Sequence, residues 1–456
     1  MNKNQHKRSA FSGKIGFVLS AAGASVGLGN IWRFPYLAAK YGGGIFLLIY
    51  IILAFTFGYT MIVAETALGR MTRKSPVGAF AAVRKGGHSF GGWINAIIPI
   101  LIVPYYSVIG GWVIKYLVEY FRGNAKLLAE DGYFTDFISN GVSTELCFVA
   151  FCAFTLIIIF AGVQNGIERV SKIMMPILIV LSVIIAVYSV TRPGALAGVK
   201  YFLVPNVKNF SWMTVVAAMG QMFYSLSIAM GILITFGSYM KKDTAIEDST
   251  RNVEIFDTGI AIMAGLMIIP AVFAFSGGDP NTLQAGPSLM FITIPKVFQN
   301  MGFGTVIGIV FFLLVLFAAV TSSIALTESA VSTFEDELGW GRKKATVLVG
   351  VIMLALGSLS SLGYGPLAGI KIIGMQFLDL FDFLTNSVMM PIAAFLTSLF
   401  VSRVVGIDKI EEEIIHGESA FRRKKVFVVM IKYLCPVFAI IILLSSVANA
   451  LGWIKM

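Results

Sequence analysis

The sequence predicts an all-α polytopic membrane protein with 11 transmembrane helices, and three observations lead to this prediction. The 456 residues are 57% hydrophobic and only 13% charged, with a mean hydropathy of +0.84. Soluble domains carry about twice that charged fraction. Apolar segments long enough to cross a bilayer recur along the whole chain. The basic residues gather in the short connections between them, so the net charge of +11 reflects membrane orientation, and no nucleic-acid partner is expected.

Eleven segments have the length and apolarity of a membrane span. They cover residues 12–37, 43–70, 91–121, 143–161, 167–191, 213–240, 252–276, 304–334, 345–362, 374–402 and 426–453. With a cytoplasmic N-terminus, 23 of the 35 Lys and Arg residues fall on the cytoplasmic side, 9 fall on the other side, and Arg33, Lys115 and Lys432 lie within spans. This bias predicts a multi-pass protein of the cell (plasma) membrane and, because the number of spans is odd, an extracellular C-terminus.

The first span is interrupted. Residues 19–36, LSAAGASVGLGNIWRFPY, contain three glycines, a polar pair at Ser25 and Asn30, and a full charge at Arg33. Glycine favours helix poorly, and a charge is costly in hydrocarbon. Irregular backbone at this depth is tolerated only where it is buried in protein or lines a cavity, where it can hold ions and substrate.

The sixth span repeats this pattern, since residues 220–231, GQMFYSLSIAMG, place polar side chains between glycines in an apolar run. Two interrupted spans five apart predict a 5+5 inverted repeat with interrupted helices 1 and 6. The predicted organisation is a cytoplasmic N-terminal segment, two repeats, a cytoplasmic loop and an eleventh span, over residues 1–11, 12–192, 213–402, 403–425 and 426–453.

Four motifs together resemble the neurotransmitter:sodium symporter family, and its bacterial amino-acid transporters in particular. They are GLGNIWRFP in span 1, GQMFYSLS in span 6, VTSSIAL in span 8 and the following FEDELG. The resemblance covers essentially the whole chain. It implies a Na+-coupled symporter with two sodium sites. The chain ends after span 11, whereas many members have twelve spans, so dimer contacts through a twelfth span are not expected.

The resemblance implies the ligands of both ions, and oxygen atoms are what a hard cation requires. The first site, Na1, is expected at Ser25, Asn30, Ser225 and Asp257, together with the substrate carboxylate. Asn30 can also cap the helix break, and Ser225 can bond back to its own helix. The second site, Na2, is expected at Gly23, Val26, Ala318, Thr321 and Ser322, although small hydroxyl residues also serve helix packing.

The substrate site is expected at the same breaks. A half-helix that starts near Leu28 offers the amides of Leu28 and Gly29 to a carboxylate, and Tyr106 resembles the family tyrosine that binds it. By resemblance, the substrate-binding residues are Ala24, Ser25, Leu28, Gly29, Ile102, Tyr106, Tyr224, Ser225, Ser227, Met230, Ser322 and Leu326. All are neutral, which favours a small neutral, mainly hydrophobic or aromatic amino acid. Met230 stands where the family often has phenylalanine and can repack around different shapes.

Two charge pairs match the gates of the family. We call the pair Arg33 and Asp382 the outer gate, and the pair Arg8 and Asp336 the inner gate. Asp379 lies one turn from Asp382 and competes for the outer role. Tyr106 and Tyr224 are expected to form a lid beneath the outer gate, with Phe11 and Tyr239 beside the inner one. Arg8 also fits ordinary positive-inside charge.

Three further residues carry expectations. Glu65, a lone carboxylate in span 2, is interpreted as a hydrogen-bond acceptor for a broken helix, with a proton-carrying role as the alternative. Gly166 and Pro176 in span 5 either allow its cytoplasmic part to unwind or only kink it.

Chloride-dependent members have asparagine and serine where this chain has Asp257 and Ala261, so Asp257 is expected to replace chloride.

The predicted function is Na+-coupled import of neutral amino acids by alternating access, independent of chloride. The alternatives are a proton- or other cation-coupled carrier of the same fold, and an amino-acid sensor without net transport. No appended signalling domain is recognised, which disfavours a sensor. An enzyme is not expected, because the sequence has no HExxH, GxSxG or cysteine–histidine motif in a plausible context.

Overall fold

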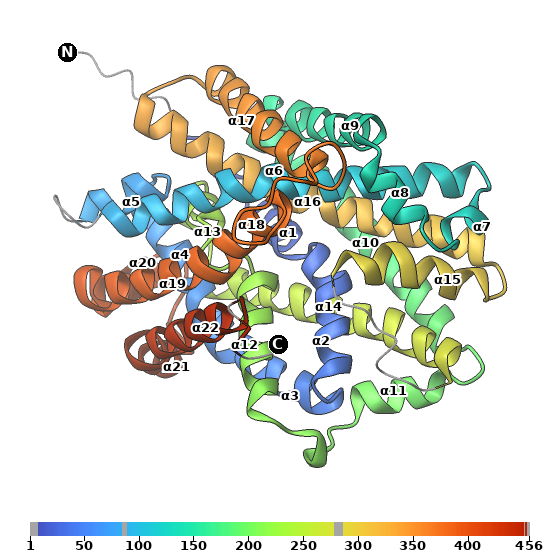
Figure 1. The fold of residues 1–456 in the computed structure, drawn as a ribbon. Coiled ribbons are helices and arrows are strands. Elements are labelled where there is room, and N and C mark those ends of the chain that lie inside the picture. The colour runs from blue at the N-terminus through green and yellow to red at the C-terminus, as the bar shows by residue number, and fades with distance from the viewer. Residues whose placement is uncertain (1–7, 84–88, 278–285, 451, 454–456) are drawn as a thin grey trace.

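The computed structural model describes residues 8–83, 89–277, 286–450 and 452–453. These residues are largely helical, with no strand among them beyond one isolated bridge between Ile372 and Met375. Long helices pack side by side around α1 (Lys14–Ser25) and α2 (Phe34–Lys40), which lie near the centre of the view in Figure 1. Of the predicted N-terminal segment 1–11, residues 1–7 lie outside the described part.

The helices of the first half are α3 (Gly44–Leu53), α4 (Tyr59–Thr72), α5 (Pro76–Val83), α6 (Ser89–Phe121), α7 (Ala125–Leu128), α8 (Tyr133–Ser139), α9 (Gly141–Phe160), α10 (Arg169–Val190) and α11 (Ala195–Leu203). Short π-helical turns, η1 (Gly29–Arg33), η2 (Ala54–Gly58) and η3 (Val163–Glu168), join some of them. A 3-10 turn, η4 (Val207–Asn209), leads to the second half.

The helices of the second half are α12 (Trp212–Ser225), α13 (Ile232–Ser238), α14 (Ile246–Ser276), α15 (Ile294–Gln299), α16 (Gly304–Leu338), α17 (Arg342–Leu362), α18 (Phe377–Asp382), α19 (Met390–Leu399), α20 (Ile407–Ile415), α21 (Lys424–Val429) and α22 (Cys435–Ala450). The π-helical turns here are η6 (Leu289–Thr293), η7 (Phe383–Met389), η8 (Phe400–Val405) and η9 (Met430–Leu434).

The described helices agree with a polytopic membrane protein. Nine are long and apolar enough to span a membrane, and α1 with η1–α2 forms a tenth candidate bent by 54°. The expected span 213–240 is divided between α12 and α13, each shorter than a bilayer is thick. A total of eleven therefore counts α12 and α13 as one broken span, and the repeat boundaries stay a prediction.

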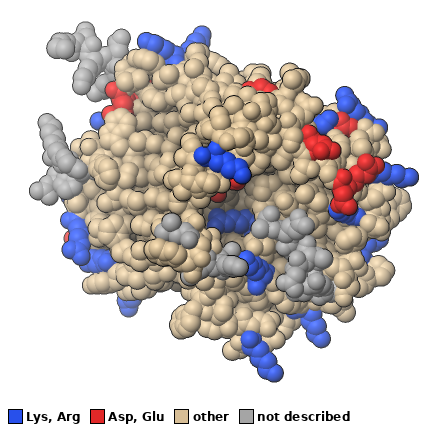
Figure 2. Space-filling model, in the orientation of Figure 1, with Lys and Arg blue, Asp and Glu red and all other residues tan. Residues whose placement is uncertain are grey.

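The surface carries few charges across most of its area. In the view of Figure 2, uncharged residues dominate, Lys, Arg, Asp and Glu are scattered mainly around the periphery, and a hollow near the middle contains basic side-chain atoms. Lys115, inside a span, is neutralised by Glu119 one turn away, with Nζ and Oε1 2.8 Å apart. Such pairing is what a charge within a membrane helix requires.

Candidate functional site

The first helix break separates α1 from η1. Val26 adopts an extended conformation, with ψ of 92°, and its N–H still bonds to the Ala22 carbonyl at 2.7 Å. Asn30 Oδ1 accepts a hydrogen bond from Gly27 N at 3.2 Å. Asn30 therefore caps the helix break, which was one of the two roles expected for it, the other being sodium ligation.

The second break, between α12 and α13, contains strained backbone. Ser227 and Ala229 have φ of +53° and +58°, a left-handed region that costs non-glycine residues about 1 kcal/mol or more. Two contacts hold this segment. Glu65 Oε1 accepts from Ala229 N at 2.8 Å, and Ser227 Oγ donates to the Ala24 carbonyl at 3.1 Å. Glu65 is thus a hydrogen-bond acceptor for a broken helix, as predicted, and Ser227 ties one break to the other.

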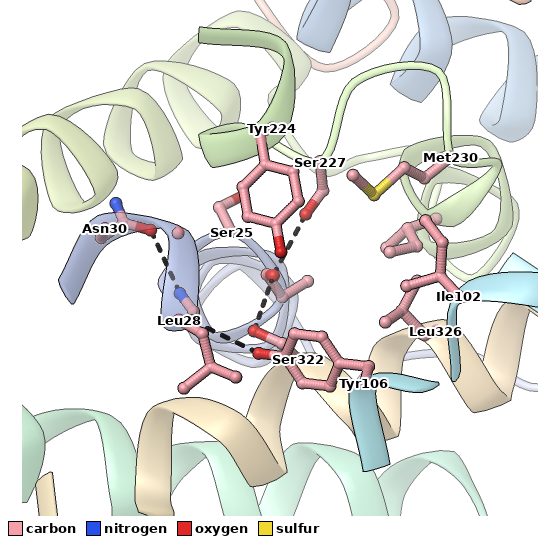
Figure 3. A pocket seen from close by; sticks show the side chains of 14 residues that line it. Ser25, Leu28, Asn30, Ile102, Tyr106, Tyr224, Ser227, Met230, Ser322 and Leu326 are labelled. Carbon is pink, nitrogen blue, oxygen red and sulfur yellow. Dashed lines mark hydrogen bonds between the residues drawn. The ribbon is translucent and has the colours of Figure 1, made fainter. Parts of the chain in front are cut away.

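A pocket lies between the two breaks (Figure 3). Its lining residues come from α1, η1, α6, the α12–α13 region and α16, and are Ala24, Ser25, Gly27, Leu28, Gly29, Asn30, Ile102, Tyr106, Tyr224, Ser227, Met230, Ile232, Ser322 and Leu326. Every predicted substrate residue is among them except Ser225. Gly27, Asn30 and Ile232 line the pocket in addition to the predicted substrate residues; Gly27 and Asn30 belong to the GLGNIWRFP motif, whereas Ile232 lies outside the quoted motifs.

The two ends of the pocket differ in chemistry. Ile102, Met230 and Leu326 form an apolar side, whereas Ser25 and the Tyr106 and Tyr224 rings lie nearer the first break (Figure 3). None of the lining residues is acidic or basic. The Leu28 amide donates to the Tyr106 hydroxyl at 3.4 Å. The amide and the phenol that were expected to meet a carboxylate therefore lie together.

Glycine is required at two positions by close approach. A Cβ at Gly29 would lie 2.2 Å from the Tyr224 ring, and one at Gly27 would lie 2.7 Å from Ser322 Oγ. Neither distance is compatible with a side chain unless its neighbour moves. The aromatic rings can therefore pack directly against the first break only because these residues have no side chain.

The side chains of the predicted Na1 site form one buried hydrogen-bonded cluster. Asn30 Nδ2 donates to Ser225 Oγ at 2.9 Å and to Asp257 Oδ1 at 2.7 Å, and Ser225 Oγ donates to the Asp257 carboxylate at 2.8 Å. Tyr50, which sequence reasoning missed, donates to Asp257 Oδ2 at 3.2 Å. Ser25 is also buried, and its hydroxyl bonds to the Ala21 carbonyl.

The predicted Na2 residues also meet. Ser322 Oγ lies 3.3 Å from the Gly23 carbonyl oxygen and 3.4 Å from that of Val26. Thr321 Oγ1 donates to the Ala318 carbonyl at 3.2 Å. The Ser322 hydroxyl of α16 thus faces carbonyls of the first break, whereas the Thr321 hydroxyl bonds back to its own helix.

Both clusters fit a hard monovalent cation. Their ligating atoms are neutral oxygens with one carboxylate, a set typical of hard cations. The described residues contain no group of three or more His, Cys, Asp or Glu that could hold a metal ion, so the donors do not resemble a transition-metal site. For Asn30 to ligate an ion, its amide oxygen must turn from Gly27 N towards the cluster, because Nδ2 now faces Asp257.

The outer gate residues share a vestibule above the pocket but are not joined. Among the described residues, no ion pair within 4.0 Å links Arg33 to Asp382, although both line this vestibule. Arg33 instead lies over the Tyr224 ring, with Cζ 5.2 Å from the ring centroid. Asp382 Oδ1 accepts from Tyr105 at 3.2 Å. Asp379, the competing carboxylate, accepts from Tyr364 at 3.3 Å.

The inner gate residues are joined. Arg8 Nη1 and Asp336 Oδ1 are 2.7 Å apart. Arg8 also donates to Ser238 Oγ, at 3.0 Å from Nε, and to Ser332 Oγ, at 2.9 Å from Nη2. Its guanidinium lies 4.9 Å from the centroid of the Tyr239 ring. Arg8 therefore does more than add positive charge.

The aromatic residues expected beside this gate are present. Phe11 N donates to the Tyr239 carbonyl at 3.0 Å, and the two rings pack edge to face with centroids 6.0 Å apart. Tyr239 donates to Glu328 at 2.7 Å. In span 5, η3 and α10 form one continuous helix over Val163–Val190, which contains Gly166 and Pro176. This structure therefore has span 5 wound, and unwinding stays a prediction.

Sequence comparison identifies the family. The model of the sodium:neurotransmitter symporter family matches residues 8–139 and 135–453. An uncharacterized sodium-dependent transporter of Bacillus subtilis, YhdH, is 34% identical over 97% of this chain and 99% of its own length. The human sodium- and chloride-dependent GABA transporter 2 is 26% identical over 90% of this chain and 75% of its own length.

Structural comparison agrees with the sequence match. The crystal structure of MhsT in complex with L-phenylalanine superposes with a TM-score of 0.86 and 34% sequence identity. The match covers 96% of this chain and all of that chain. This chain belongs to the sodium:neurotransmitter symporter family and is a sodium-dependent membrane transporter, not an enzyme.

Proposed function

We propose that this protein imports neutral, mainly hydrophobic or aromatic amino acids together with Na+, by alternating access. The observation that carries the proposal is the pocket between the two helix breaks, whose lining residues are all uncharged. A charged substrate side chain would be buried there without a partner, at a cost of several kcal/mol. The L-phenylalanine in the MhsT structure supports the same substrate class.

The carboxylate of the substrate is proposed to bind at the first break. The Leu28 amide and the Tyr106 hydroxyl, 3.4 Å apart, are both able to donate to it, and the half-helix that follows adds a positive dipole end. The hydrophobic side chain then lies against Ile102, Met230 and Leu326. In this arrangement, Met230→Phe narrows the accepted size range, because a rigid ring replaces a flexible thioether.

Two sodium ions are proposed, one at each oxygen cluster. The first, near Asp257, shares the substrate carboxylate, which couples ion binding to substrate binding. The second lies between α1 and α16, so it favours the conformation in which these helices are packed together. Thr321→Ala with Ser322→Ala is expected to raise the sodium concentration needed for half-maximal uptake by about tenfold, roughly one lost charge-assisted contact.

Chloride is proposed to be unnecessary. Asp257 supplies a negative charge next to the first ion, and Asn30, Ser225 and Tyr50 hold that carboxylate in place. Ala261 offers no hydroxyl to an anion. A unit charge a few ångströms away is worth about 4 kcal/mol at an effective dielectric of 20, which is enough to decide the matter. Uptake should be unchanged when gluconate replaces chloride, and Asp257→Asn with Ala261→Ser should gain chloride dependence or lose activity.

The proposal places the protein in the cell membrane with a cytoplasmic N-terminus. The inner gate then faces the cytoplasm, and the joined inner gate with an unjoined outer gate corresponds to an outward-facing state. Import follows when the outer gate joins over bound substrate and the inner gate separates.

The decisive experiment measures binding and transport separately. Purified protein is screened by thermal shift against the twenty amino acids in sodium and in potassium, and proteoliposomes are then tested for uptake of the best ligand. We expect hydrophobic and aromatic amino acids to stabilise the protein in sodium only, and a sodium gradient to drive uptake.

Each alternative predicts a different result. Full uptake in sodium-free choline buffer with a proton gradient would indicate a proton-coupled carrier, for which Glu65, whose buried Oε2 has no hydrogen-bond partner, is the candidate group. Binding without uptake would indicate a sensor. Glutamate or lysine competing as well as leucine or tryptophan would overturn the substrate assignment.

A further inference from the structure

The Asp382 carboxylate uses its two oxygen atoms differently. Oδ1 accepts hydrogen bonds from the Asn386 amide at 2.5 Å and from the Tyr105 hydroxyl at 3.2 Å. Among the described residues, Oδ2 has no hydrogen-bond partner, and Asp382 lines the vestibule that Arg33 also lines. One oxygen is therefore held by the protein, and the other is available to a donor that enters the vestibule.

Asn386 is committed to this carboxylate. A carboxylate oxygen only accepts hydrogen bonds, so the amide must turn Nδ2 towards Asp382. The same Nδ2 donates to the Tyr105 hydroxyl at 3.2 Å, which closes a triangle of three side chains from α6, α18 and η7. Asn386 Oδ1 is buried and has no hydrogen-bond partner within the described ranges. A buried carbonyl oxygen left in this way costs about 1–3 kcal/mol, so stability alone does not account for an asparagine here.

The backbone around Asn386 is also irregular. The triangle lies where α18 passes into the π-helical turn η7 (Phe383–Met389), and such turns in α-helical segments are frequent at functional sites. Thr385, in the same turn, lies 3.3 Å from the Tyr105 hydroxyl. The Tyr105 hydroxyl is therefore placed by contacts from this turn as well as by α6.

Arg33 is the donor that this arrangement lacks. Its guanidinium carries five N–H groups, and among the described residues none of them has a hydrogen-bond or ion-pair partner; the guanidinium lies over the Tyr224 ring. Gly220 leaves room beside it, since a Cβ there would lie 3.9 Å from Arg33 Nη2. Joining the outer gate requires Arg33 to approach Asp382 Oδ2 across the vestibule.

We propose that Asn386 is a positioning residue of the outer gate, which holds the Asp382 carboxylate by Oδ1, with help from Tyr105, so that Oδ2 stays free for Arg33. The carboxylate is then already oriented when substrate binds, and the gate joins without a search over side-chain rotamers. Without the amide, the Tyr105 hydroxyl alone holds the carboxylate by Oδ1, so the orientation of Oδ2 is less well fixed and the joined state loses part of its advantage. This inference rests on the proposed function, since it concerns closure over bound substrate.

The test measures closure of the vestibule directly. Ser446, on α22, also lines the vestibule, so Ser446→Cys in the full-length protein with Cys147→Ser serves as a reporter for a charged methanethiosulfonate reagent. The other two cysteines, Cys152 and Cys435, are buried. Reaction rates are compared in sodium with and without L-phenylalanine. We expect the ligand to slow the reaction about fivefold in the parent and less than about twofold in Asn386→Ala.

A double-mutant cycle separates positioning from structural support. If Asn386 acts through the carboxylate, Asn386→Ala has no further effect on closure in an Asp382→Ala background. Ser387→Ala is the matched control, because Ser387 is the next residue and lines the same vestibule. It should behave as the parent. Tyr105→Phe removes the other donor and should weaken closure in the same direction, which keeps the test decisive if Asn386→Ala does not fold.

Two outcomes overturn the inference alone, namely closure in Asn386→Ala as complete as in the parent, or an equal loss with and without Asp382. A parent that L-phenylalanine does not slow in sodium would instead overturn the proposed substrate and sodium dependence, and this inference with them.

Discussion

The inner and outer gates each pair one arginine with one aspartate, yet only the inner pair is joined in this structure. Arg8 contacts Asp336, Ser238 and Ser332 and also lies over an aromatic ring. Within the described part of the chain, Arg33 contacts an aromatic ring but has no hydrogen-bond or ion-pair partner. The difference shows that the two gates are not joined at the same time in this conformation. Of the two gates, the inner one therefore has more hydrogen bonds in this conformation.

The largest effect is expected from breaking the inner gate, which is the one that is joined. Arg8→Ala removes charge-assisted hydrogen bonds, and a net loss of about 3 kcal/mol, the upper value for one such bond, should shift the balance towards an open inner side by about 100-fold. Sodium-driven uptake in proteoliposomes should fall at least about tenfold, and thiol labelling from the inner side should rise.

Lys343→Ala is the control for Arg8→Ala, since Lys343 is an exposed basic residue in the first turn of α17. Uptake by Arg8→Ala equal to that of wild type would mean that Arg8 contributes only positive charge.

A second test disturbs the outer closure through its aromatic floor. Gly29→Ala places a methyl group 2.2 Å from the present position of the Tyr224 ring, so the ring must move and the stacking of Arg33 on it is lost. We expect the affinity for L-phenylalanine in sodium to fall about tenfold, measured by equilibrium binding. Gly259→Ala is the control, because a Cβ there meets no atom within 4 Å. Unchanged binding by Gly29→Ala would show that the Tyr224 ring is not part of the substrate site.

The outer pair itself should matter for rate more than for affinity. Asp382→Ala removes the acceptor for Arg33, which is unpaired in this conformation, so substrate binding should change less than about threefold while the transport rate falls about fivefold or more. Uptake and binding must be measured on the same preparation. Asp379→Ala tests the competing carboxylate, and a larger loss in that variant would identify Asp379 as the true partner.

The smallest effect is expected at the edge of the inner closure. Tyr239→Phe removes only the hydroxyl that donates to Glu328, and Glu328 keeps Arg342 as a partner at 2.6 Å. A lost hydrogen bond of about 1 kcal/mol corresponds to a shift of about fivefold in inner-side labelling. Tyr433→Phe, at a ring that is 64% exposed, should change nothing. A change as large as that of Arg8→Ala would place the main inner lock at Tyr239.

Much of the architecture was predictable because it depends on local composition. Membrane spans follow from runs of apolar residues, and the two breaks follow from glycine and polar residues inside such runs. Glu65 was correctly predicted to accept a hydrogen bond for a broken helix, since a lone carboxylate in a span needs a donor. The helical stretch over Leu289–Gln299 was not predicted, because it is too short to span a membrane and contains Pro295.

Some residues around the site could be recognised from the sequence, and others could not. Ser25, Asn30 and Ser322 lie in recognisable motifs, so the sequence drew attention to them. Tyr50 gives no such signal, since a tyrosine in an apolar run is ordinary, and only the fold brings it to Asp257, 207 positions away. Asn386 likewise gives no signal in the sequence, and only the fold brings its amide to the Tyr105 hydroxyl, 281 positions away.

The sequence by itself determined the membrane spans and the two helix breaks, because each is set by the types of residues that are near one another along the chain. The tertiary structure decided which distant side chains share an oxygen atom and which gate is joined. Such contacts depend on how helices pack, and two gate arrangements of one chain differ by only a few kcal/mol, a difference too small for residue patterns to encode.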